Sequence, residues 1–145
     1  MGRILGIDHG DARIGIAMSD ETEFLASPLA TVQNKKTAID EIVSMVMEHK
    51  VGMIVVGLPR NMNGTYGPAT EKVRAFIKKL SEKTAVPIVE WDERLSTVSA
   101  HSDLRAAGLD SRKHKEVIDK VAARIILQNY LDAKTTAEKM EGEKP

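Results

Sequence analysis

The sequence predicts an α/β fold, a mixed five-stranded sheet with helices on both faces. Three observations support this prediction. The chain begins with short apolar runs joined by tight turns. Strand-like segments then alternate with segments of helical periodicity, and a further helical segment follows near the end. The resulting order is β-β-β-α-β-α-β-α. A hairpin-built half followed by two β-α crossovers gives strands of both directions in one sheet.

The first strands form a hairpin. Residues 3–8 are rich in apolar and β-branched side chains, the polar turn 9–12 follows, and residues 13–18 form the second strand. Residues 24–32 are expected to add a third strand. Pro28 confines that strand to an edge or a bulge, because proline cannot donate to a sheet ladder.

The middle of the chain contains two crossovers. A helix is predicted from about Lys35 to His49 with Asn34 as its cap, because its apolar residues recur at helical spacing. The apolar run 53–56 has the length of a central strand and ends in Gly57-Leu58-Pro59. After a polar loop, Pro68 can open a second helix.

The last part of the domain begins with a strand from Pro87 to Trp91. A short helix capped by Ser96 or Thr97 should end near Gly108, and a charged connector, 110–115, leads to a last helix from roughly Lys115 to Asp132. We expect residues 1–133 to form a single domain and the polar residues 134–145 to form a disordered tail.

The composition narrows the functional classes. The chain has 145 residues with 21 basic and 21 acidic side chains, so net charge gives no support for a nucleic-acid partner. Cysteine is absent, which excludes disulfides, thiolate metal sites and cysteine nucleophiles. No signal peptide or membrane span is visible, and a cytoplasmic location with no membrane partner is expected.

Three acidic residues stand on separate elements. Asp8 ends the first strand, where ligands bind in such sheets, although it could equally cap the turn. Glu93 follows a strand that should point the same way, although alone it fits a solvated strand end. Asp119 lies on the helix side that carries Ala122 and Ala123, although the helix dipole could stabilise it near the start of the helix.

Together these acids predict a catalytic and metal-binding site at one edge of the sheet, made of Asp8, Glu93 and Asp119. Because only oxygen ligands converge there, Mg²⁺ (or Mn²⁺) is the expected cofactor. The four histidines lack the short spacing of a zinc site. Hard cations at such sites stabilise the attacking and leaving oxygens of phosphoryl displacement, so the pattern indicates a phosphodiester hydrolase.

Basic and small polar residues near this edge are candidate contacts for phosphates. The basic stretch before the Asp119 helix fits a solvated charge run equally well. Aromatic residues are 3% of the chain, which favours recognition of the backbone over stacking on bases. The predicted nucleic-acid-binding residues are Gly10, Arg13, Arg60, Arg94, Ser96, Thr97, Arg112, Lys113 and Lys115.

Five ordered blocks between Arg3 and Leu131 resemble the YqgF/RuvX family. They are Gly6-Ile7-Asp8-His9-Gly10, Arg13-Ile14-Gly15, Val56-Gly57-Leu58-Pro59, Asp92-Glu93-Arg94-Leu95-Ser96-Thr97, and Asp119-Lys120-Val121-Ala122-Ala123 with the apolar residues that follow. The resemblance implies an RNase H-like fold related to RuvC-type resolvases. It also implies a nuclease that matures the 5′ end of pre-16S rRNA in ribosome biogenesis, described earlier as a Holliday junction resolvase.

The family's acidic positions fall on Asp8, Glu93 and Asp119. In the resolvases the second acid follows the preceding strand, which here ends in Gly57-Leu58-Pro59 without an acid, so DNA-junction chemistry does not follow from the resemblance. Precursor rRNA is the favoured partner and branched DNA the alternative. Ribosome-assembly factors and a second copy of the chain are further candidate partners.

Two other functional readings fit parts of the sequence. A sugar-kinase or actin-like ATPase also carries an Asp-x-Gly hairpin near phosphates, but it needs two such domains, and no Gly-x-x-x-x-Gly-Lys-Ser/Thr loop is present. A non-catalytic RNA- or protein-binding module of the same fold would not need three converging acids. The nuclease reading therefore explains more of the sequence than either alternative.

Overall fold

The computed structural model describes residues 2–59, 66–92 and 111–142, with side chains of 111–116 and 136–142 outside the description. The strands are β1 (Arg3–His9), β2 (Arg13–Ser19), β3 (Ala26–Gln33), β4 (Val51–Leu58) and β5 (Ile88–Asp92), and the helices are α1 (Ala38–Glu48), α2 (Pro68–Lys83) and α4 (Ser111–Gly142). The predicted short helix between Ser96 and Gly108 lies outside the described residues.

The five strands form one mixed sheet in the order β3-β2-β1-β4-β5. β1 pairs with β2 and β2 with β3 in antiparallel fashion, whereas β4 lies parallel to β1 and β5 parallel to β4. β3 is an edge strand, and its register against β2 shifts beside Pro28, as proline requires. The carboxyl ends of β1, β4 and β5 therefore meet at one edge of the sheet.

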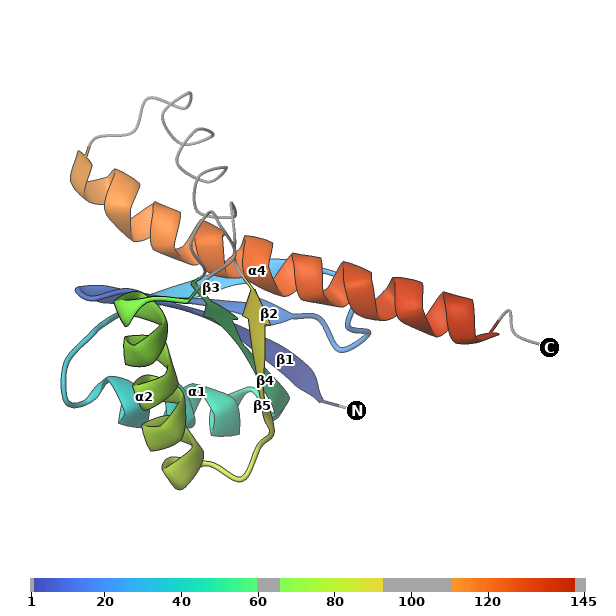
Figure 1. Ribbon diagram of the computed structural model, residues 1–145, viewed down its shortest axis with the longest axis horizontal. Helices are drawn as coiled ribbons and strands as arrows, with labels where there is room; N and C mark the ends of the chain where they lie inside the picture. Colours follow the sequence, from blue (N-terminus) through green and yellow to red (C-terminus); the bar gives the residue numbers. More distant parts are fainter. Residues whose placement is uncertain (1, 60–65, 93–110, 143–145) are drawn as a thin grey trace.

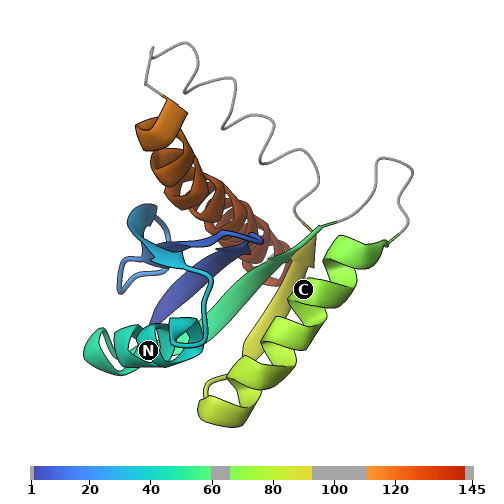
Figure 2. The ribbon, with the colours of Figure 1, turned by 90° about the vertical axis from the view of Figure 1, so that its left-hand side faces the viewer.

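Helices cover both faces, as predicted. α4 crosses one face of the sheet, while α1 and α2 lie on the other (Figure 1). Figure 2 shows the same three layers from the side, with the sheet between α4 and the pair α1 and α2. Strand residues alternate between the two faces, so Leu5 and Ile7 join the core under α1 and α2, and Ile4 joins the core under α4.

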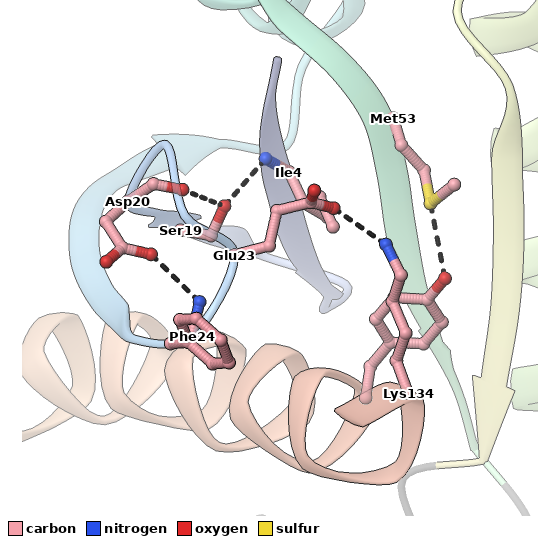
Figure 3. Close-up of polar contacts among 8 residues, drawn as sticks. Ile4, Ser19, Asp20, Glu23, Phe24, Met53 and Lys134 are labelled. Atoms are coloured by element: carbon pink, nitrogen blue, oxygen red, sulfur yellow. Dashed lines mark hydrogen bonds and ion pairs between the residues drawn. The ribbon is translucent and has the colours of Figure 1, made fainter. Parts of the chain in front are cut away.

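The C-terminal half of α4 is held by polar contacts to the turn between β2 and β3. The side chain of Gln128 accepts a hydrogen bond from the Ala26 N–H at 2.9 Å and donates one to the Phe24 carbonyl at 2.9 Å. Lys134 pairs with Glu23 at 2.8 Å, close to the turn that Asp20 closes (Figure 3). These contacts fix the direction in which α4 crosses the sheet.

Two helices have boundaries that differ from the prediction. α1 begins at Ala38, after a turn in which the Ala38 N–H bonds the Lys35 carbonyl, and the amide of Asn34 donates to the Gly10 carbonyl at 2.7 Å instead of capping the helix. α4 is longer at both ends than predicted. It takes in most of the expected connector from Ser111, and it continues to Gly142 where the sequence predicted a disordered tail from Lys134.

Candidate active site

Asp8 lies on the α4 face of the sheet, near the carboxyl end of β1. Along this strand Ile7 belongs to the core under α1 and α2, and His9 contacts Phe76 of α2 with ring centroids 4.7 Å apart. Because side chains alternate along a strand, Asp8 between them belongs to the opposite face, with Gly6. The residue is partly exposed, which suits a carboxylate that must meet a ligand.

Gly15 brings α4 into contact with the sheet next to Asp8. In the β1–β2 ladder Gly15 is the cross-strand partner of Asp8. The backbone carbonyl of Asp119 lies directly on Gly15, so close that a Cβ at position 15 would overlap it. Glycine is therefore required here for the close approach of the helix, and this approach places Asp119 beside the strand end that carries Asp8.

Asp119 faces the sheet, as its helical position predicted. Its neighbours on that side, Ala122 and Ala123, are 1% and 0% exposed, and the Asp119 side chain itself is 17% exposed. Because α4 begins at Ser111, Asp119 lies about two turns inside the helix. The helix dipole acts within the first turn, so it does not account for the position of this carboxylate.

Arg13 balances the charge of Asp119. The Arg13 Nε donates to the Asp119 Oδ2 at 2.7 Å, and the Arg13 side chain is 26% exposed. Arg13 lies on β2 two residues before Gly15, and hence on the same face of the sheet. The sequence predicted Arg13 as a phosphate contact and Asp119 as a metal ligand, but it did not predict that the two would pair.

The third predicted acid, Glu93, lies outside the described residues. β5 ends at Asp92, which pairs in register with Leu58 of β4. Since β1, β4 and β5 run in the same direction, the chain leaves β5 at the edge where Asp8 lies. β4 ends at that edge without an acidic residue, as the sequence indicated.

The two described acids fit a hard cation. Asp8 and Asp119 lie on the same face of the sheet, and Asp119 already pairs with the positive charge of Arg13. Carboxylate oxygens are the ligands that Mg²⁺ and Mn²⁺ prefer. Within the described part of the chain, no cluster of three histidine, cysteine or acidic side chains is close enough to hold a metal. A cation held by these two acids would take any further ligand from the remaining residues or from solvent.

The predicted nucleic-acid contacts are spread over described and undescribed segments. Gly10 turns the chain between β1 and β2, where its N–H donates to the Arg13 carbonyl at 2.9 Å. The first turns of α4 carry Arg112, Lys113 and Lys115, whose side chains are outside the description. Arg60, Arg94, Ser96 and Thr97 are not among the described residues.

A family model described as "RuvX: Holliday junction resolvase" matches residues 2–133. The chain belongs to the RuvX family. Among the curated proteins, the "Putative pre-16S rRNA nuclease" of Thermoanaerobacter pseudethanolicus is 48% identical over 134 residues, which cover 90% of this chain and 96% of that protein. The protein of the same name from Heliobacterium modesticaldum is 47% identical, with 91% and 90% covered.

Solved structures of resolvases share the fold of this RuvX chain. The Thermus thermophilus RuvC in complex with a Holliday junction superposes with a TM-score of 0.56 at 11% identity, covering 94% of this chain and 97% of that one. The fowlpox virus resolvase bound to Holliday junction DNA gives 0.55 at 11% identity, covering 90% and 97%. The predicted RNase H-like fold is thus confirmed. Within the described residues, no helix is both long and apolar enough to cross a membrane.

Proposed function

We propose that this RuvX chain is a metal-dependent endonuclease that hydrolyses phosphodiester bonds in precursor 16S rRNA during maturation of its 5′ end. The observation that carries the proposal is the close approach of the Asp119 backbone to Gly15, the cross-strand partner of Asp8, near the carboxyl end of β1. The name of the curated relatives supports the substrate. A cytoplasmic location follows from that substrate.

Each residue of the site has a role that its position supports. Asp8 and Asp119 supply carboxylate oxygens for Mg²⁺ or Mn²⁺, and we assign Glu93, which follows β5 at the same edge, as the third ligand. When bound, the cation stabilises the negative charge that develops on the phosphate oxygens during displacement. Arg13 pairs with the Asp119 carboxylate through a 2.7 Å hydrogen bond until a cation takes its place, and its guanidinium then lies beside the place where a phosphate would bind.

A DNA-junction nuclease is the second candidate. The description of the matching family favours it. The absence of an acid at the carboxyl end of β4 argues against the resolvase arrangement of ligands that the sequence resemblance implied. Precursor rRNA is therefore the first substrate to test.

The test compares both substrates with the same purified protein. We expect Mg²⁺ or Mn²⁺ to support cleavage of a precursor 16S rRNA leader, and excess EDTA to stop it. A four-way DNA junction should be cut more slowly at equal protein concentration. Faster cleavage of the junction would favour the second candidate, and full activity in EDTA would contradict the metal-dependent mechanism for either substrate.

A further inference from the structure

A basic groove lies on the face of the sheet opposite Asp8 and Asp119. It is a cavity of about 560 Å³ between the turn after β1, the start of α1 and the exposed side of α2. The residues that give it its charge are Lys35, Lys36, Lys72, Lys79 and Asp11. None of these lysines was predicted to bind a ligand. Lys72 and Lys79, for example, occupy solvent-facing positions of an amphipathic helix, where a lysine is expected whether or not it binds anything.

The positive charge of this groove is a local excess. The whole chain carries 21 basic and 21 acidic residues, yet among the described residues four lysines and a single acidic residue line the groove. That residue, Asp11, makes an exposed pair with Lys72 at 3.2 Å, so these lining residues carry three more positive than negative charges. The acidic residues of the first turn of α1, Asp40 and Glu41, are not among its lining residues.

The floor of the groove is formed by two packed rings. Phe76 is 6% exposed, and the His9 ring packs on it with centroids 4.7 Å apart. Asn34, whose amide holds the turn through the Gly10 carbonyl, completes a polar wall. Lysine side chains beside this packed floor suit a phosphodiester backbone whose sugars lie against the floor.

The groove and the candidate active site contain neighbouring residues of β1. Asp8 lies on the α4 face and the next residue, His9, lines the groove, so only the edge of the sheet separates the two. A second cavity of about 220 Å³ lies between the Gly10 turn and the start of α2 and shares His9, Asp11 and Lys72 with the first. A strand cut beside Asp8 could pass round this edge into the groove.

We propose that the groove holds the RNA strand that flanks the cut, through contacts of Lys35, Lys36, Lys72 and Lys79 with its phosphates. This inference rests on the proposed function, and it adds a binding surface that the catalytic acids do not include. The ligand is a single-stranded polyribonucleotide. The contact is independent of base sequence, because lysines bind phosphates and, in the described part of the chain, no exposed aromatic ring lines the groove.

The experiment compares two double variants on the same helix, with equal loss of charge. Lys72→Gln with Lys79→Gln removes two cations from the groove, whereas Lys78→Gln with Lys83→Gln removes two exposed cations that do not line it. Binding of a single-stranded precursor rRNA leader fragment is measured in EDTA at several salt concentrations, so that cleavage does not intervene. Thermal midpoints show that both variants fold.

We expect the groove variant to lower the slope of log affinity against log salt by about 1.4 units, and the affinity at 0.1 M salt by roughly 25-fold. The Lys78/Lys83 control should keep the wild-type slope. Equal slopes in the two variants would overturn the groove. The proposal would also be overturned if the groove variant lost the binding of an acidic polypeptide while the binding of RNA by the same variant stayed unchanged.

The same proteins distinguish failure of this inference from failure of the proposed function. Wild-type protein that cleaves the leader with Mg²⁺, combined with an unchanged slope in the groove variant, overturns the groove and leaves the nuclease intact. A slope that falls in the groove variant, combined with no cleavage by the wild type, supports the groove and contradicts the nuclease.

Discussion

Substituting Gly15 by alanine should separate the two described acids of the site. The carbonyl of Asp119 lies on Gly15, and an added Cβ would overlap it enough to require a shift of about 1 Å in the helix or the strand. A flexible side chain could move aside, but the obstacle here is the backbone of α4. Overpacking of this kind costs about 3 kcal/mol, which for a chain of this size lowers the thermal midpoint by roughly 6–12 °C.

The catalytic effect of Gly15→Ala should exceed its effect on stability. A displacement of about 1 Å between groups that act together can lower a rate by roughly 10²-fold. We would measure cleavage of the precursor rRNA leader with Mg²⁺ well below the midpoint of the variant, so that unfolding does not contribute. Gly52→Ala is the control, because its Cβ would meet its nearest neighbour, the Cα of Gly2, at an ordinary 3.5 Å.

Two results would refute the reasoning about Gly15. If Gly15→Ala keeps both the wild-type midpoint and the wild-type rate, the close approach of α4 to β2 is not a feature of the protein. If the midpoint falls while the rate is unchanged, the approach matters for packing but does not position Asp119 for the reaction.

Three further predictions concern single side chains. Asp119→Asn should abolish most cleavage while the thermal midpoint moves by only a few degrees, because the amide oxygen can still accept a hydrogen bond from Arg13. Adding Asp8→Asn should lower the rate little further, because the effects of residues that act as one unit are not additive. Arg13→Gln should tighten Mn²⁺ binding, measured by calorimetry, because the guanidinium no longer pairs with Asp119. The same variant should weaken RNA binding, because it lacks the guanidinium that would contact a phosphate. Weaker Mn²⁺ binding would contradict this prediction. Burial lowers the pKa of His9 below 6.5, so the unfolded chain takes up the proton more readily than the folded protein, and stability falls as pH drops from 6.5 towards the folded pKa. The thermal midpoint of His9→Gln should therefore fall less between pH 7.5 and 5.5 than the midpoint of the wild type. An equal fall in both proteins would refute this prediction.

The fold could be predicted from local patterns, because strand and helix periods are visible within short windows. Pro28 correctly indicated an edge strand with an irregular register. The helix ends were less predictable: Asn34 has the chemistry of a cap, but its amide serves the Gly10 carbonyl of the neighbouring turn. The extension of α4 to Gly142 was missed because a polar, charged sequence is compatible with both a tail and an exposed helix.

The sequence could propose the residues of the candidate site but not how their side chains pair. Asp8 and Asp119 could be proposed from their positions at a strand end and on an apolar helix face. The approach of Asp119 to the strand that pairs with Asp8 depends on Gly15, and no local sequence pattern reveals this role of Gly15. The pair between Arg13 and Asp119 spans 106 positions, and periodicity carries no information at that separation.

The central claim is that Asp8 and Asp119 hold a divalent cation together. The most direct measurement is a crystal of the protein soaked in Mn²⁺, with the anomalous signal of manganese locating the ion. We predict a peak between the two carboxylates, about 2.2 Å from an oxygen of each, and an Arg13 side chain that no longer donates to Asp119. Crystals at saturating Mn²⁺ that show no peak there, with the Arg13–Asp119 pair intact, would contradict the claim.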